Sequence, residues 1–310
     1  MSTETFIDRR FSQGSLDLIE TANEICRDMS AQGYNLTLRQ LYYQFVSHHG
    51  LPNSQKSYKR LGSVINDARL AGLMDWRFIS DRTRNVNGSF GGFDSPTQFI
   101  QQMAPSYGEA IWEGQEFRPK VWVEKDALVD VIGQACRDTR TPYFSCRGYV
   151  SQSEMYDAAK RFQRRRRQGF TPLVIHLGDH DPSGIDMSRD IKDRLELMSW
   201  GDVEVRRIAL NMDQIEQYSP PPNPAKLTDS RGTAYVEEYG DESWELDALE
   251  PSVLTALIQE ELEGLIDRDA MDACIDHENA QIARMEQIAD RWSEIDDRWA
   301  QIESDILDEL

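Results

Sequence analysis

The sequence predicts an α/β fold with additional α+β and helical parts. Between residues 120 and 205, short apolar runs alternate with helical patterns, which is typical of a parallel sheet covered on both faces. The segment before it has the pattern of a small helical DNA-binding domain, and the segment after it is strongly helical. We therefore expect three domains, over residues 1–117, 118–250 and 251–310.

Composition favours a folded protein outside the membrane. The 310 residues are 39% hydrophobic and 28% charged, enough to bury a sizeable core. No apolar run approaches the roughly 20 residues of a membrane helix, and the first residues lack the apolar stretch of a secretory signal. The four cysteines are far apart and form no CxxC pair, so we expect reduced thiols and a cytoplasmic protein.

The net charge of −20 is unevenly distributed. Residues 237–310 hold 24 acidic and 4 basic residues, whereas residues 1–236 hold 30 of each. Charges more than roughly 10 Å apart are largely screened at 0.1 M salt. An acidic C-terminal quarter therefore does not exclude a nucleic-acid partner elsewhere on the chain.

The N-terminal pattern is helix, helix, helix and strand. Apolar spacing predicts helices over 14–29, from an N-cap at Thr37 to Gly50, and from Ser54 to Gly72. Residues 76–79 have the composition of a strand, and the glycine-rich stretch 87–92 suits the tip of a hairpin. This order is typical of a helix-turn-helix with a wing.

The C-terminal segment carries a heptad pattern. From Met285 to Ile306 the apolar residues alternate spacings of three and four, with tryptophan at 292 and 299. We expect this face to pair with another helix, in the same chain or in a second copy.

Acidic residues follow two of the predicted strands. Asp179 and Asp181 come directly after the run 173–177, and Glu124 follows the run 121–123. The carboxyl ends of parallel strands meet at one sheet edge, so these oxygens can offer a site for Mg²⁺ or Mn²⁺. The alternative for Asp181 is an N-cap with Pro182 at the first helical position, which needs no metal.

These motifs resemble a known family. VWVEKDALVDVI, LGDHDPSGIDM and the upstream TLRQLYYQF are similar to the Toprim and winged-helix motifs of the A subunit of topoisomerase VI and the related meiotic double-strand-break protein. The resemblance covers roughly residues 36–195. The chain differs in residues 146–150, which keep Gly-Tyr without the family's proline, and it contains no Walker A sequence.

The resemblance implies a winged-helix domain, a Toprim domain and a Mg²⁺-dependent DNA-cleaving transesterase. It makes Tyr43 the nucleophile, with Arg39 one turn before it on the same helix face, and it makes Glu124, Asp179 and Asp181 the metal ligands. It further implies a homodimer acting on double-stranded DNA and a separate ATPase subunit. Without the resemblance, the sequence predicts that Tyr43 is an ordinary surface tyrosine. Adjacent Tyr42 falls on the core side of the helix.

DNA contacts are expected from basic residues on the third helix and beside the wing: Lys56, Lys59, Arg60, Arg69, Arg82 and Arg84. The basic run Arg164–Arg167 has two equally good interpretations. It can contact DNA, or it can complement the helix dipole at the C-terminus of its helix. Two other functions remain open. One is a Toprim nuclease that cuts with metal-activated water, and the other is a non-catalytic DNA-binding assembly protein.

Overall fold

The computed structural model describes residues 3–79, 92–225 and 230–308, with side chains except at 230, 231 and 303–308. The contacts divide the described chain into two compact units. The first combines residues before 85 with 117–265, and the second combines residues 92–116 with those from 266 onward. This differs from the expected division, because the segment 92–116 leaves the N-terminal part and 251–265 leaves the C-terminal extension.

The N-terminal part of the first unit is built from three helices, α1 (Gln13–Ala31), α2 (Leu38–His48) and α3 (Gln55–Leu70). Thr37 caps α2 as predicted, and its side chain and that of Gln40 form a reciprocal capping box. Ser54 caps α3, where its side chain accepts a hydrogen bond from the backbone N–H of Ser57. The three helices share one apolar core around Leu41, Leu61 and Ile65.

A four-stranded parallel sheet forms the centre of the first unit. Its strands are β1 (Phe117–Val123), β2 (Tyr143–Ser145), β3 (Thr171–Leu177) and β4 (Glu204–Ala209), in the order β2-β1-β3-β4. The α/β prediction is thereby confirmed.

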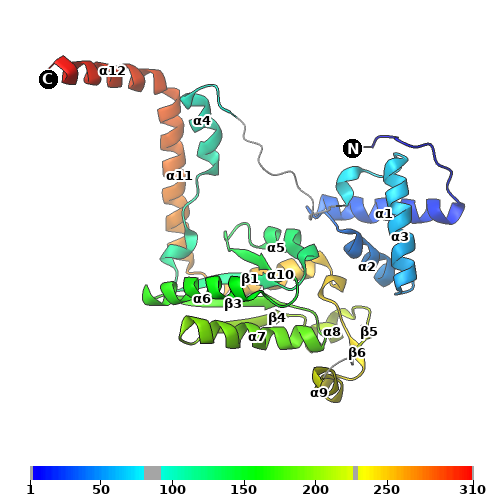
Figure 1. Ribbon diagram of the computed structural model, residues 1–310. Coiled ribbons are helices and arrows are strands. Elements are labelled where there is room, and N and C mark those ends of the chain that lie inside the picture. Colours follow the sequence, from blue (N-terminus) through cyan, green and yellow to red (C-terminus); the bar gives the residue numbers. More distant parts are fainter. Residues whose placement is uncertain (1–2, 80–91, 226–229, 309–310) are drawn as a thin grey trace. The chain divides into compact units, whose positions relative to one another are not determined.

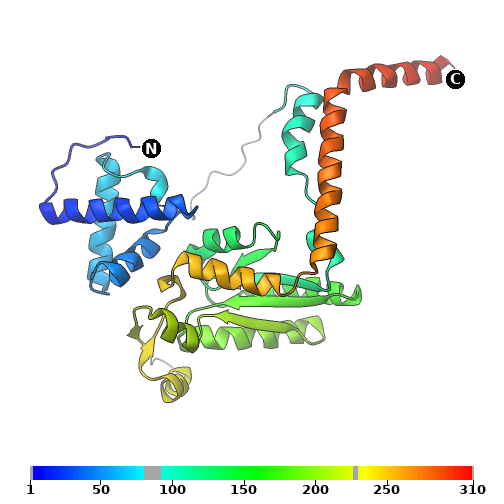
Figure 2. The ribbon, with the colours of Figure 1, turned by 180° about the vertical axis from the view of Figure 1, so that it is seen from behind.

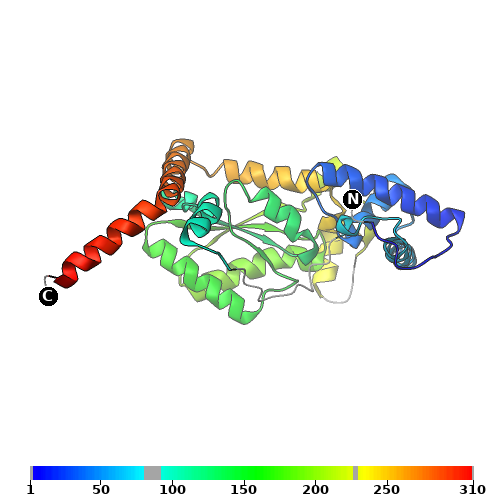
Figure 3. The ribbon, with the colours of Figure 1, turned by 90° about the horizontal axis from the view of Figure 1, so that it is seen from above.

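Helices cover both faces of the sheet (Figure 1). On one face lie α6 (Gln152–Arg167) and α7 (Pro182–Ser199); on the other lie α5 (Val129–Ala135), preceded by the short 3₁₀ turn η4 (Asp126–Leu128), and α10 (Pro251–Glu263). Figure 3 shows the sheet between these two layers. The core strands are apolar on both sides, as this arrangement requires.

Smaller elements complete the first unit. α8 (Met212–Tyr218) and α9 (Ser230–Tyr239) follow β4. β5 (Asn223–Pro224), which lies between these two helices, pairs with β6 (Glu242–Ser243), which follows α9, in a two-residue antiparallel ladder. The 3₁₀ turn η5 (Leu246–Ala248) comes after β6.

The prediction of a strand over residues 76–79 is wrong. Residues Trp76–Phe78 form a 3₁₀ turn, η1, because the Asp75 side chain accepts a hydrogen bond from the backbone N–H of Arg77 at 3.0 Å. Ile79 alone makes a bridge, to Leu36. The expected wing tip falls almost entirely on residues 80–91, outside the described part of the chain.

The second unit is helical (Figure 2). α4 (Pro96–Met103) packs beside α11 (Arg268–Asp290), and the 3₁₀ turns η2 (Ala104–Ser106) and η3 (Ile111–Gly114) also contact α11. α12 (Trp292–Asp308) follows α11 after a break at Arg291. The C-terminal segment is thus strongly helical, as expected, and is divided into the three helices α10, α11 and α12. None of the helices in the described ranges is long and apolar enough to cross a membrane.

Candidate functional site

Two of the three predicted acids meet where β1 and β3 end. Val123 pairs with Leu177, so Glu124 and Asp179 follow neighbouring strand ends. The Glu124 carboxylate accepts a hydrogen bond from the backbone N–H of Asp179 at 2.9 Å. After β1 the chain continues to β2 on one side of the sheet, and after β3 it continues to β4 on the other side. The two acids therefore lie at a topological switch point between β1 and β3, which is where α/β sheets commonly bind ligands.

Asp181 has a defined structural task. Its side chain accepts a hydrogen bond from the backbone N–H of Gly184 at 2.7 Å and caps α7, with Pro182 in the first turn. This is the N-cap alternative considered for the sequence. Asp181 still lies near enough to Glu124 to raise the pKa of that carboxyl.

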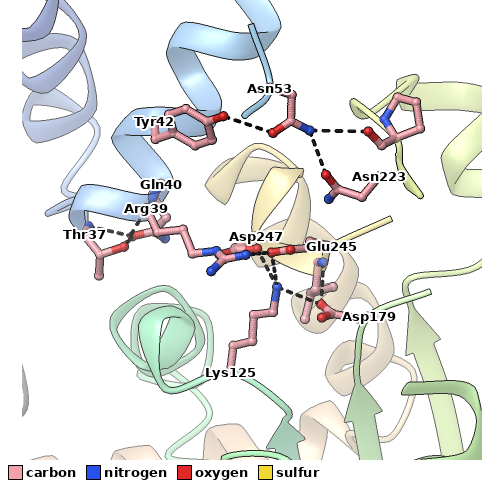
Figure 4. A network of polar contacts seen from close by, with 12 residues as sticks. Thr37, Arg39, Gln40, Tyr42, Asn53, Lys125, Asp179, Asn223, Glu245 and Asp247 are labelled. Carbon is pink, nitrogen blue, oxygen red and sulfur yellow. Dashed lines mark hydrogen bonds and ion pairs between the residues drawn. The ribbon is translucent and has the colours of Figure 1, made fainter. Parts of the chain in front are cut away.

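A network of charges joins Asp179 to the α2 helix (Figure 4). The Lys125 ammonium lies 3.1 Å from Asp179, 2.7 Å from Glu245 and 2.8 Å from Asp247. Arg39 pairs with the same Glu245 and lies 3.1 Å from Asp247. Arg39 on α2 and Lys125 after β1 thus both pair with the same two carboxylates. These are Glu245 and Asp247, in the segment before α10.

Burial and charge shift the ionisation of these groups strongly. Burial raises the pKa of Asp179 to about 7, although Lys125 opposes the shift. Burial also raises the pKa of Glu124, and Asp181 adds to the rise. For Glu245, burial acts upward, but Lys125 and Arg39 outweigh it and hold its pKa at about 2. Glu245 is therefore a firm anion, whereas Asp179 titrates near neutral pH.

Arg207 on β4 supports the loop that carries Asp179. Its guanidinium donates to the backbone carbonyls of Asp179 at 2.7 Å, Gly178 at 3.0 Å and Gly184 at 2.9 Å. Burial lowers its pKa to about 10. A buried cation that holds three carbonyls of the 178–184 loop fixes the backbone from which the acids project.

Tyr43 is buried, which corrects the expectation of a partly exposed side chain; it is 4% exposed. The Arg39 guanidinium lies 5.9 Å from the centre of the Tyr43 ring, as expected for one helix face. Burial, together with Asp247 and Glu245, raises the pKa of the Tyr43 phenol, although Arg39 opposes the shift. Tyr43 and Arg39 line a hollow of about 250 Å³ together with Asn53, Asn223 and Glu245.

Tyr42 has a structural environment. Its hydroxyl accepts a hydrogen bond from the backbone N–H of Ser54 at 2.7 Å and lies 3.0 Å from the Asn53 side chain, where α3 begins. Its ring packs edge-on against Tyr58 at 5.3 Å. These contacts place Tyr42 in the core, in agreement with its helix face.

The three proposed metal ligands have suitable chemistry but are engaged in other contacts. All offer carboxylate oxygens, and burial raises the pKa values of Glu124 and Asp179, which a bound cation would oppose. However, Lys125 neutralises Asp179, and Asp181 caps α7. Within the described ranges, no three acidic, histidine or cysteine side chains are grouped as metal ligands. A cation here would have to displace Lys125 from Asp179.

The predicted DNA contacts divide into three groups. Lys56, Lys59 and Arg60 are exposed on α3. The Arg69 guanidinium instead lies 4.4 Å from the centre of the Trp76 ring and donates to the Trp76 carbonyl at 3.0 Å. Arg82 and Arg84 lie outside the described residues. Of the basic run on α6, Arg166 binds the Ser199 and Asp202 carbonyls at 2.6 and 2.8 Å, which is a structural task.

Sequence reasoning did not include Glu245, Asp247, Lys125 or Arg207 in the site. Lys125 follows Glu124 directly and could have been considered as its counterion. Glu245 and Asp247 lie in a segment that the pattern identified only as an acidic stretch, and Arg207 lies in a strand of otherwise ordinary composition. Neither a comparison with protein-family models nor one with curated proteins gives a match.

Proposed function

We propose that the protein cleaves DNA by tyrosine transesterification in a Mg²⁺-dependent reaction, in the manner of the topoisomerase VI A subunit. The observation that carries the proposal is the bridge of ion pairs from Arg39, one turn from Tyr43, to Lys125 and Asp179 at the sheet edge. The phenol and the carboxylates on which the resemblance depends thus belong to one compact unit.

The proposed reaction exchanges one phosphoester for another. The Tyr43 hydroxyl oxygen forms a bond to a backbone phosphorus, and the bond from that phosphorus to the 3′ oxygen breaks. The phenol loses its proton, and the departing 3′ oxygen takes one up. The product is a 5′-phosphotyrosyl bond, so no energy-rich cofactor is consumed. Arg39 supplies positive charge beside the phenol, which favours its ionised form.

Glu124, Asp179 and Asp181 would hold the Mg²⁺ ion. When bound, such an ion supplies charge neutralisation for phosphate oxygens. Glu124 and Asp179 contribute by following neighbouring strand ends, where the Glu124 carboxylate accepts a hydrogen bond from the backbone N–H of Asp179. Lys125 balances Asp179 in the resting protein.

In the resting arrangement, the surroundings of Tyr43 disfavour ionisation of its phenol. A buried phenol beside Asp247 and Glu245 stays protonated at neutral pH. DNA phosphates would draw Arg39 away from Glu245, and the phenol must then reach the phosphate. Cleavage in this proposal is therefore coupled to rearrangement of the Arg39 ion pairs.

Lys56, Lys59 and Arg60 on α3 are proposed to bind the duplex. They are exposed on a helix that follows α2 after a short turn, as in a helix-turn-helix. Arg69 is left out of this surface because it stacks on Trp76.

The test is the covalent adduct. Wild-type protein is incubated with end-labelled duplex DNA and Mg²⁺, denatured, and separated by electrophoresis. We expect a labelled protein band for the wild type and for Tyr42→Phe, and none for Tyr43→Phe. Tyr42→Phe is the matched control, because it removes the same hydroxyl from the neighbouring residue.

Two results would count against the proposal. If Tyr43→Phe still cuts DNA at the wild-type rate, the cut is made by water and the protein is a Toprim-type nuclease. If the wild type binds DNA but never cuts it in Mg²⁺ or Mn²⁺, the non-catalytic assembly function is the better account.

A further inference from the structure

The α12 helix exposes an apolar face that suits pairing with another helix. Ile295, Trp299 and Ile302 are 41%, 60% and 47% exposed. With Trp292 they repeat at spacings of three and four, the pattern of a coiled-coil seam. Large apolar side chains concentrated on one helix face mark an interaction surface.

Over residues 291–303, the charges beside this seam have a consistent sign on each flank. Arg291 and Arg298 directly precede the tryptophans, which places them at the g positions of the heptads. Asp296 directly follows Ile295, and Glu303 directly follows Ile302 in the sequence, which makes these the e positions. Between residues 291 and 303 one flank is therefore basic and the other acidic, and the basic flank ends before Asp305, the next g residue.

The arginines gather on one side of the α11–α12 corner. Arg284, Arg291 and Arg298 line a hollow of about 530 Å³, together with Ile288 and Ile295. These are three of the four basic residues in the whole acidic segment 237–310. Arg291 pairs with Glu294 at 2.7 Å, but both side chains are more than 60% exposed. Exposed pairs of this kind contribute little and exchange readily for a better partner.

We infer that α12 associates with α12 of a second copy of this chain, in parallel and in register. In a parallel pair, a g residue faces the e residue five positions further along the other helix. Arg291 then faces Asp296 of the second copy, and Arg298 faces the position of Glu303. Each contact occurs twice by symmetry, so the seam is flanked by attractive pairs on both sides.

The opposite orientation forms fewer attractive pairs from the same charges. In an antiparallel pair, g residues face g residues and e residues face e residues. Acid would then oppose acid on the e flank, and on the g flank arginine would oppose arginine except where Arg291 or Arg298 meets Asp305 of the other copy. A protein or nucleic-acid partner of one charge would satisfy only one of the two flanks, whereas a second copy satisfies both.

The test uses charge reversal in the full-length chain. Arg291→Glu with Arg298→Glu makes both flanks acidic, and Asp296→Lys with Glu303→Lys makes both flanks basic. We expect each double variant alone to weaken self-association at least tenfold by sedimentation, and an equimolar mixture of the two to form a heterodimer of about wild-type affinity. Circular dichroism of each variant checks that the helices remain.

Orientation is tested by crosslinking. Ile295→Cys and Ile302→Cys, made separately, are both expected to form an intermolecular disulfide on mild oxidation, because each seam residue meets its own copy in a parallel pair. An antiparallel pair would allow this at one of the two sites at most. The inference is overturned if the reversal variants dimerise like the wild type, if their mixture does not associate, if only one cysteine variant crosslinks, or if the wild type sediments as a monomer at 100 µM.

Discussion

Gly184 shows how one residue of the 179–184 motif is fixed by backbone geometry. A Cβ at this position would overlap the backbone carbonyl of Asp179. The close approach lets Arg207 bind the carbonyls of both residues. The motif Asp-x-Asp-Pro-x-Gly is therefore partly a requirement of the turn into α7, with Asp181 as cap and Gly184 as the point of contact.

The buried side chain of His176 makes the free energy of unfolding depend on pH. Burial, with a smaller contribution from Arg207, lowers its pKa to about 3, and its Nδ1 lies 2.8 Å from the Ser188 hydroxyl. In the unfolded chain it titrates near pH 6.5, so the unfolded state gains a proton first on acidification. The contribution of His176 to the free energy of unfolding is therefore fully present above pH 6.5. It decreases as the pH falls toward 3, by at most about 1.4 kcal/mol per pH unit.

We expect His176→Gln to flatten this dependence. Urea unfolding of both proteins at several pH values between 7 and 4 gives the difference in unfolding free energy. His180, whose pKa burial lowers to about 4, contributes in the same direction in both proteins and cancels. A difference that stays constant with pH would show that His176 does not titrate in this way.

At the scale of elements, the α3 surface gives a prediction about salt. Replacing Lys56, Lys59 and Arg60 by alanine should weaken DNA binding and lower the slope of log affinity against log salt by roughly 2 to 3, about one per lost phosphate contact. Binding is measured by fluorescence anisotropy from 50 to 300 mM salt.

The control for the α3 variant is Arg189→Ala with Lys192→Ala on α7. These two residues are exposed and already paired with acids of their own helix. The control should leave the slope unchanged. Equal slopes for the α3 variant and the wild type would contradict DNA binding by α3.

Helices and strands with regular patterns and caps could be predicted from the sequence. The central strands β1 and β3 are mostly apolar, and the capping box of Thr37 and Gln40 marks the start of α2. The turn at Trp76 could not be predicted from composition, because it depends on local hydrogen bonds that Asp75 accepts from Arg77 and Phe78. The break at Arg291 preserves the heptad spacing, so periodicity gives no sign of it.

At the scale of the whole molecule, the site could be predicted only in part. Glu124 and Asp179 are found because both follow strands, and strand ends of a parallel sheet meet. Glu245 and Asp247 reach Lys125 across about 120 residues of chain, through a segment with little regular pattern. Such a contact depends on tertiary folding and leaves no local signal.

The charge of the molecule leads to a prediction for the acidic end. Residues 292–310 hold seven acidic residues and one basic residue. If they serve association, deleting them should convert a dimer to a monomer and weaken DNA binding through lost avidity. If they act as a mimic that occupies the DNA surface, the deletion should tighten binding and steepen its salt dependence. Sedimentation and anisotropy on the same samples separate these outcomes, and we expect the first.

The pairing of Val123 with Leu177 has a consequence for how the sequence can vary. The position of each acid is set by the register between β1 and β3. Side chains within these strands can therefore be exchanged for others of similar size while Glu124 and Asp179 keep their places at the strand ends. An added or lost residue in either strand is different: it shifts that strand by about 3.3 Å and turns its side chains to the other face. Through time this part of the chain should therefore accept substitutions far more readily than insertions or deletions.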